Sequence, residues 1–310
     1  MDGQILSVTL SQMLVMMFFV AAGWLLGKKK IIPPDGSNVL SKLEINLFMP
    51  LMVLNNLSSN VTVENAKEKG NYFLASVPLL LLIILSANLL ARLFAKERQR
   101  QNMLIYAFSF ANCGYLGYPV IRAVFGEEML SNFILFMVPS TLALYSYGQS
   151  LFDPEEKNPL YRKLIKPVTV SLVIGVAIGL LGLKLPMAVS TALSTGADMV
   201  GPTAMLMTGI ILSRCSLRKL LIKPFSYLVA FIKLVAYPAV IFAVMYLLGA
   251  RGPLLLCSVT VGAMPVGMNI IVFPTANGLD STEGAGHCLI ANILSVITVP
   301  VIFSVLARVM

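Results

Sequence analysis

Charged side chains are scarce in this sequence. They make up 12% of the 310 residues, against 57% hydrophobic residues, and the mean hydropathy is +0.85. A soluble globular fold of this length is excluded, because too few polar side chains remain to cover its surface. The composition is typical of a polytopic membrane protein.

Cysteine and histidine are also sparse, which argues against a metal centre and against catalysis. Cys113, Cys215, Cys257 and Cys288 show no metal-binding spacing, and His287 is the single histidine. The sequence shows no recognisable set of nucleophile, base and acid of the kind that an enzyme active site requires. We therefore predict no metal, no resident cofactor and no enzymatic activity. His287 is a candidate proton relay, although a lone intramembrane histidine is more often a packing residue.

Long apolar stretches predict ten membrane-spanning helices. Each stretch has roughly the 20 residues that are needed to cross the hydrocarbon core of a bilayer. They cover residues 5–27, 38–58, 71–95, 102–124, 131–152, 166–183, 187–212, 224–248, 252–276 and 284–307. The first stretch has no basic segment or cleavage site like those of a signal peptide, so we expect it to be retained as a span.

The lysine and arginine residues predict the orientation in the membrane. Most of them fall in alternate loops, around residues 28–30, 96–100, 157–166 and 214–223. By the positive-inside rule these loops are cytoplasmic, 153–167 is the main cytoplasmic linker, and both termini are extracytoplasmic. We expect a multi-pass protein of the cell membrane. Its net charge of +9 reflects this bias and contact with anionic lipid, so no nucleic-acid partner is needed.

The chain repeats itself at an offset of 152 residues. The matched features are Asn46 with Asp198, Pro50 with Pro202, 71–95 with 223–247, and Phe125-Gly126 with Asn277-Gly278. Five spans in each copy would insert the second copy upside down relative to the first, as in secondary transporters. We predict an all-α fold with a 5+5 inverted repeat, residues 1–152 forming the first repeat and residues 168–310 the second.

The fourth and ninth predicted spans contain glycine and proline at mid-membrane. The two segments run from Asn112 to Pro119 and from Gly262 to Asn269. Both helices should break there, and irregular backbone at that depth must line a cavity or be buried in protein. The free N–H groups at the start of a half-helix favour an anion such as a carboxylate. The alternative is a pair of proline kinks that only shape helix packing.

Two motifs carry a resemblance to a known family. Asn112-x-x-x-x-Gly117-x-Pro119 followed by Phe125-Gly126 resembles the fourth-helix motif of the auxin efflux carrier family. Residues 263–267 followed by Val272-Phe273 are similar to that family's ninth-helix motif. The resemblance covers essentially the whole chain. It implies a fold like that of bile-acid/sodium symporters, in which helices four and nine cross at their breaks.

The same resemblance implies which helices move during transport and which residues bind the substrate. Transport helices three to five and eight to ten would move against scaffold helices one, two, six and seven. The implied substrate-binding residues are Asn112, Gly114, Tyr115, Gly117, Pro119, Pro265, Gly267 and Asn269. The central loop is short, unlike that of many plant PIN carriers, so the bacterial branch of the family is favoured. The implied substrates are small carboxylates such as malate, malonate or lactate, with an auxin-like acid less favoured.

Ionisable groups inside the predicted spans are candidates for coupling transport to H+ or Na+. Asp198 and Lys233 lie about midway along the seventh and eighth spans. Either they neutralise each other as a structural ion pair, or Asp198 binds the driving ion with Asn46 as its counterpart in the other repeat. Glu44, beside Lys42 at the end of the second span, is assigned to the membrane interface.

The sequence therefore predicts a carrier that moves a small organic anion by elevator-type alternating access. The lipid bilayer is its environment, and a second copy of the chain is a candidate partner. An anion channel of the same fold is one alternative. A ligand-sensing membrane receptor is another, although no signalling domain is recognisable in the sequence.

Overall fold

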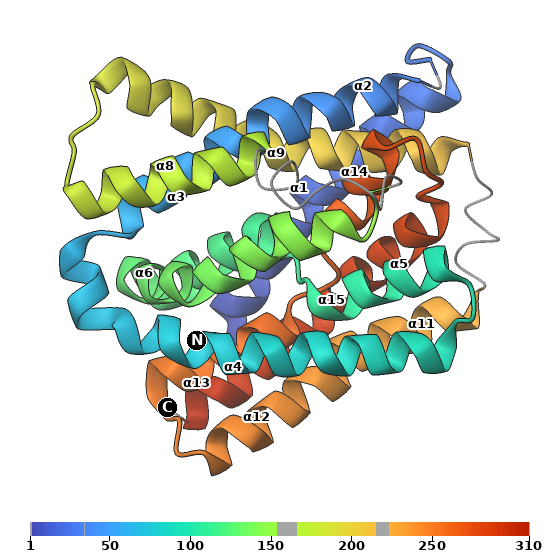
Figure 1. The fold of residues 1–310 in the computed structure, drawn as a ribbon. Helices are drawn as coiled ribbons and strands as arrows, with labels where there is room; N and C mark the ends of the chain where they lie inside the picture. The colour runs from blue at the N-terminus through green and yellow to red at the C-terminus, as the bar shows by residue number, and fades with distance from the viewer. Residues whose placement is uncertain (1, 34, 154–165, 215–222, 310) are drawn as a thin grey trace.

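The structure is a computed structural model that describes residues 2–33, 35–153, 166–214 and 223–309. Within these ranges all regular secondary structure is helical, apart from one isolated bridge (Figure 1). This confirms the all-α class. The predicted linker lies almost entirely outside the described residues, as do Cys215 and most of the basic cluster that follows Arg214.

The first half of the chain contains long helices interrupted by single π turns. Its elements are α1 (Asp2–Lys28), α2 (Gly36–Leu43), η1 (Glu44–Phe48), α3 (Met49–Asn60), α4 (Val63–Phe94), α5 (Arg98–Ser109), η2 (Cys113–Gly117), α6 (Tyr118–Ala143) and η3 (Leu144–Gly148). Helix α4 begins where the Thr62 side chain accepts a hydrogen bond of 3.1 Å from the Asn65 N–H, an N-cap that satisfies a free donor. Helix α6 is kinked at Gly126, which has φ 84°.

The second half is built in the same way. Its elements are α8 (Pro167–Leu181), α9 (Met187–Ser213), α11 (Pro224–Phe231), η4 (Ile232–Ala236), α12 (Tyr237–Leu247), α13 (Gly252–Ala263), α14 (Asn269–Ala276) and α15 (Thr282–Val309). Proline stands in the first turn of α8 and α11, where its missing N–H costs no helical hydrogen bond. Gly182 ends α8 in the left-handed conformation (φ 61°), a common helix stop.

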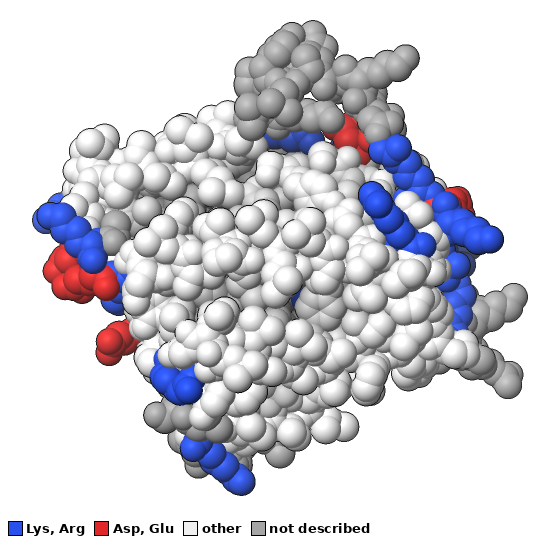
Figure 2. Space-filling view, turned by 60° about the horizontal axis from the view of Figure 1, so that its bottom comes forward, with Lys and Arg blue, Asp and Glu red and all other residues white. Residues whose placement is uncertain are grey.

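Several described helices are long and apolar enough to cross a membrane. Five stretches meet that description, namely Lys67–Phe94, Cys113–Gly148, Met187–Ser213, Pro224–Leu247 and Thr282–Arg308, and three shorter apolar helices accompany them. Figure 2 shows charged side chains gathered at two opposite ends of the molecule, with an uncharged band between them. These features fit a multi-pass membrane protein. The ten-span inverted repeat itself stays a prediction.

The helices pack in two main groups. In one, α1 lies against α9, and α3 lies against both α8 and α9; in the other, α4 packs on α5 and α6, while α11 packs on α15. The contact between α1 and α9 is close because both contribute glycine. A Cβ atom added at Gly209 would lie 2.1 Å from the carbonyl oxygen of Val20, and one at Gly23 would lie 2.1 Å from that of Leu206. Small residues permit this kind of approach between helices in membranes.

Candidate functional site

Two helix interruptions meet inside the molecule. Helix α5 ends at Ser109 and helix α13 at Ala263, and the extended segments that follow form an antiparallel bridge between Ala111 and Val266. The Asn112 N–H donates to the Pro265 carbonyl over 2.7 Å, and the Gly267 N–H donates to the Phe110 carbonyl over 3.1 Å. Each break thus supplies hydrogen-bond partners to the other, which irregular backbone requires at this depth. Both predicted interruptions are present, and they lie side by side.

The first interruption begins earlier in the chain than its glycines and proline suggest. The extended residues are 110–112, whereas Gly114 and Gly117 lie in η2, and Pro119 lies in the first turn of α6. Because η2 runs directly into α6, Pro119 lies inside a continuous helical segment that starts at Cys113. The expectation that Pro119 breaks the fourth helix is therefore wrong in position. Pro265, in contrast, lies within the second interruption.

Gly267 is required by the close approach of the two segments. A Cβ atom at this position would lie 3.1 Å from the Tyr106 hydroxyl and 3.3 Å from the Phe110 carbonyl oxygen. Those distances are shorter than ordinary van der Waals contact, so a larger residue would push the segments apart. The small residue therefore keeps the bridge geometry.

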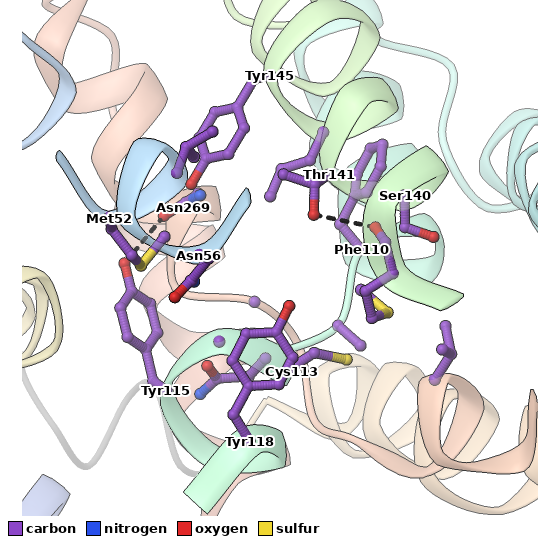
Figure 3. A pocket seen from close by; sticks show the side chains of 18 of the residues that line it. Met52, Asn56, Phe110, Cys113, Tyr115, Tyr118, Ser140, Thr141, Tyr145 and Asn269 are labelled. Atoms are coloured by element: carbon purple, nitrogen blue, oxygen red, sulfur yellow. Dashed lines mark hydrogen bonds between the residues drawn. The ribbon is translucent and has the colours of Figure 1, made fainter. Parts of the chain in front are cut away.

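A cavity of about 80 Å³ lies beside the bridge (Figure 3). Its wall combines the predicted residues Asn112, Gly114, Tyr115, Gly267 and Asn269 with residues that sequence reasoning did not select. The latter include Met52, Asn56, Tyr118, Ser140, Thr141 and Tyr145. The predicted residues Gly117, Pro119 and Pro265 are not among those that line it. Met52 and Asn56 come from α3 and Tyr145 comes from η3, and neither element contains the closely spaced glycines and proline that marked the two interruptions.

Tyr115 and Asn269 form the polar part of this wall. The Tyr115 hydroxyl lies 3.5 Å from Asn269 Oδ1 and 3.1 Å from Glu44 Oε1. Figure 3 shows the Asn269 amide between the hydroxyls of Tyr115 and Tyr145. The two tyrosines come from different π turns, η2 and η3, whereas Asn269 is the first residue of α14. Three separate elements therefore place polar groups around one end of the cavity.

Asn112 is buried at the first interruption, with 2% of its surface exposed. Its Nδ2 donates to Asn292 Oδ1 over 3.2 Å, and its own Oδ1 has no hydrogen-bond partner. Asn292 is held in place because its Nδ2 donates to the Cys288 carbonyl over 2.7 Å. Sequence reasoning missed Asn292, although a carboxamide inside the apolar last span was a usable signal.

Glu44 lies in the protein interior and not at the membrane interface. It is fully buried, and its Oε1 accepts the Tyr115 hydrogen bond while Oε2 has no partner. The sequence placed it at the interface because Lys42 lies two positions before it. Lys42 is indeed exposed, but Glu44 starts the π turn η1 on the opposite, inward face.

Lys233 and Asp198 do not neutralise each other. Lys233 is fully buried, its Nζ donates to the Phe108 carbonyl over 3.3 Å, and its charge lies 5.6 Å from the centre of the Tyr237 ring. Asp198 is exposed, and no ion pair joins the two within the part of the chain that the structure describes. The ion-pair alternative is therefore wrong. The carbonyl end of helix α5 takes the place of a counter-ion, as expected for a cation near a helix C-terminus.

The remaining coupling candidates lie outside the cavity wall. Asn46 is exposed, and its Nδ2 donates to the Lys42 carbonyl over 2.8 Å. His287 is buried, and its Nδ1 lies 3.0 Å from Ser226 Oγ. Its Nε2 lies 3.7 Å from Glu283 Oε1, an oxygen that also accepts a 2.9 Å bond from Arg100. His287 thus has polar partners that the sequence could not identify.

Each of the four described π turns contributes one buried or partly buried functional group. These groups are Glu44 in η1, Tyr115 in η2, Tyr145 in η3 and Lys233 in η4. A π turn inserts one residue into a helix and turns a side chain toward a different face, and such turns are frequent at functional sites. Tyr115 and Tyr145 line the cavity and Glu44 bonds to Tyr115 behind it, whereas Lys233 does not line the cavity.

Comparison with known proteins gives a consistent result. A family model described as "Membrane transport protein" matches residues 8–163 and 156–303. The chain is similar to an uncharacterized transporter of Methanothermobacter thermautotrophicus, with 25% identity over 295 residues, covering 93% of this chain and 95% of the relative. It is also similar to an uncharacterized transporter of Methanocaldococcus jannaschii, with 23% identity and coverage of 92% and 95%.

Proposed function

The chain belongs to the membrane transport protein family, that of the auxin efflux carriers, and from this premise we propose that it is a secondary transporter of a small organic anion. The observation that carries the proposal is the meeting of two helix interruptions beside a cavity whose wall includes the side-chain amides of Asn112 and Asn269. Helical segments η2–α6 and α14 begin at this cavity, with Gly114 and Asn269 in its wall. Their free N–H groups and dipoles favour a carboxylate.

The cavity wall would bind an anion through uncharged hydrogen-bond donors. Its lining within the described residues contains no lysine, arginine or histidine. Amide groups of Asn112 and Asn269, hydroxyls of Tyr118 and Tyr145, and backbone N–H groups are the available donors.

Elevator-type alternating access is the mechanism that we propose. It is supported by the packing of α1, α2, α3, α8 and α9 against one another, which would form the fixed scaffold. Helix α14, which follows the second interruption, contacts α2 and α9 as well as α5 and α15, so it lies at the boundary between the two groups. The interrupted segments would move as the transport part. The proposed 5+5 inverted repeat is supported by Gly126 (φ 84°) and Gly278 (φ 72°), which are 152 residues apart and share a positive φ angle.

The placement in the cell also belongs to the proposal. Both termini would be extracytoplasmic, and the basic loops would face the cytoplasm. A homodimer is compatible with the exposed apolar helix faces, although the same faces are suited to lipid.

A ligand screen on the purified protein tests the proposed substrate class. We expect lactate, malonate or malate to raise the unfolding temperature, since a ligand that binds only the folded state stabilises it. Each acid is compared with its amide, which has similar size but no charge, with and without sodium and at two pH values. Stabilisation by the amides alone would contradict anion recognition.

A counterflow assay distinguishes a carrier from an anion channel and from a ligand-sensing receptor. Vesicles loaded with the unlabelled acid should take up the labelled acid transiently and with saturable kinetics. A channel would show flux without such exchange, and a receptor would bind the acid without flux.

A further inference from the structure

Glu44 has too few hydrogen-bond partners to be a purely structural carboxylate. It is fully buried, only the Tyr115 hydroxyl donates to it, and its Oε2 has no partner. An ionised carboxylate in such a place normally needs a cation or several donors. A purely structural role would leave the unpartnered oxygen unexplained.

The surroundings of Glu44 supply no cation. Its π turn packs against α2, α3, α8, α9 and α14. The charged groups on these elements, Lys42 and Asp198, are exposed, and Arg214 at the end of α9 is exposed as well. The titratable groups that face Glu44 are the hydroxyls of Tyr115 and Tyr145. Within the described residues, no lysine, arginine or histidine is paired with this carboxyl group.

The single hydroxyl hydrogen of Tyr115 links the protonation state of Glu44 to the hydrogen bonding of Asn269 in the cavity wall. A tyrosine hydroxyl has one hydrogen to donate, yet Tyr115 lies 3.1 Å from Glu44 Oε1 and 3.5 Å from Asn269 Oδ1, which both accept. When Glu44 is ionised, it takes this hydrogen. When Glu44 carries a proton, its own O–H donates to the Tyr115 oxygen, and Tyr115 is free to donate to Asn269.

We propose that Glu44 is the proton-binding site of this transporter, and that its proton acts through Tyr115 to orient Asn269 for the anion. This rests on the proposed carboxylate site. With Oδ1 held by Tyr115, the Asn269 amide is fixed with its N–H groups toward Tyr145 and the cavity. Proton and anion therefore bind better together than separately, which is a positive coupling between two sites.

The relay crosses the boundary between the two packing groups. Glu44 lies in η1 between α2 and α3, whereas Tyr115 and Asn269 belong to the interrupted segments. Glu44 takes its proton from the aqueous phase on one side and returns it to the other side after the interrupted segments have moved. One proton then accompanies each anion, and a monocarboxylate crosses without net charge.

Binding of an acid as a function of pH tests the inference. The probe is whichever of lactate, malonate and malate binds the purified protein most tightly, measured at pH 5.5, 6.5 and 7.5. We expect the Kd of the unaltered protein to rise by up to about tenfold per pH unit, the limit for one linked proton. Glu44→Gln, which keeps the shape and a permanent donor, should bind with a Kd that changes less than about twofold over this range.

Two further variants make the result specific. Tyr115→Phe keeps Glu44 but removes the hydroxyl that links it to Asn269, so its Kd should also lose the dependence on pH. This variant tests the inference on its own if Glu44→Gln does not fold. Glu68→Gln makes the same chemical change at an exposed position and should keep the response of the unaltered protein. The acid's own ionisation contributes equally to all of these proteins.

The outcomes separate this inference from the proposed function. A pH response that survives in both Glu44→Gln and Tyr115→Phe would overturn the role of Glu44 while leaving carboxylate transport intact. If the Kd loses its pH dependence in Asp198→Asn but keeps it in Glu44→Gln, the proton-binding site is Asp198 and not Glu44. Failure of every acid to bind the unaltered protein at any pH would refute the proposed function itself.

Discussion

Single buried polar residues define the site. Asn112 Oδ1 and Ser109 Oγ in the cavity wall, and Glu44 Oε2 behind Tyr115, are buried polar atoms without hydrogen-bond partners. A buried polar group that lacks a partner costs about 1–3 kcal/mol of stability. Such groups in and beside one cavity are understandable if a ligand or a proton satisfies them during function.

Replacing Asn112 by alanine should weaken binding of the acid by about tenfold or more, equivalent to about 1.4 kcal/mol. The change removes a donor at the first interruption and also releases Asn292, whose Oδ1 accepts from it over 3.2 Å. Titration of the purified variant with the best-binding acid measures the effect. Asn71→Ala, an exposed asparagine of α4, is the matched control. Equal affinities of the two variants would show that the anion binds elsewhere.

At the scale of the elements, close helix packing and helix interruption have different causes. Helices α1 and α9 approach closely because glycines remove side-chain bulk, and α5 and α13 stop because their next residues pair with each other. The first contact belongs to the proposed scaffold, and the second belongs to the proposed transport part. Substitutions in the first should therefore affect stability more than substrate recognition.

Gly209→Ala should lower the thermal stability of the protein in detergent. Its Cβ atom would lie 2.1 Å from the Val20 carbonyl oxygen and 2.6 Å from the Trp24 nitrogen, so α1 and α9 must separate. Overpacking of this kind typically costs about 1–3 kcal/mol. Gly70→Ala introduces the same methyl group where no atom lies within 4 Å, and it should be neutral or slightly stabilising. Identical unfolding temperatures for the two variants would contradict the close packing.

At the scale of the whole molecule, the face seen in Figure 2 has charged side chains at two opposite ends and an uncharged band between them, as expected for a protein that crosses a membrane. Connections between successive helices alternate between these ends in Figure 1, with the α3–α4 and α8–α9 connections at one end and the α4–α5 connection at the other. The positive-inside rule assigns the end that includes the α4–α5 connection to the cytoplasm. That assignment is open to a direct test.

Cysteine labelling in intact cells measures the orientation. In a background with Cys215→Ser, where the described cysteines are buried, Lys184→Cys should react with an impermeant maleimide from outside. Lys29→Cys should react only after the cells are permeabilised. Both positions are exposed, so access to reagent decides the result. The opposite labelling pattern would invert the proposed topology.

Local patterns in the sequence determined the class of the protein and the existence of its interruptions. Apolar runs of sufficient length become helices wherever the backbone must satisfy its own hydrogen bonds, and this needs no knowledge of distant contacts. Met264 and Pro265 directly follow α13, and proline removes a helical hydrogen bond there. Proline alone does not decide the end of the helix, because Pro202 and Pro300 lie inside continuous helices. The family motifs were likewise readable as short strings of residues.

Tertiary structure alone decided which polar residues face the site. Asp198 and Glu44 are both acidic residues in apolar helices, yet the first is exposed and the second is fully buried. The difference comes from packing, because the π turn η1 directs Glu44 toward Tyr115, whereas α9 presents Asp198 outward. Periodicity predicts that a helix forms. Which of its faces is covered, and by what, depends on partners that are far away in the chain.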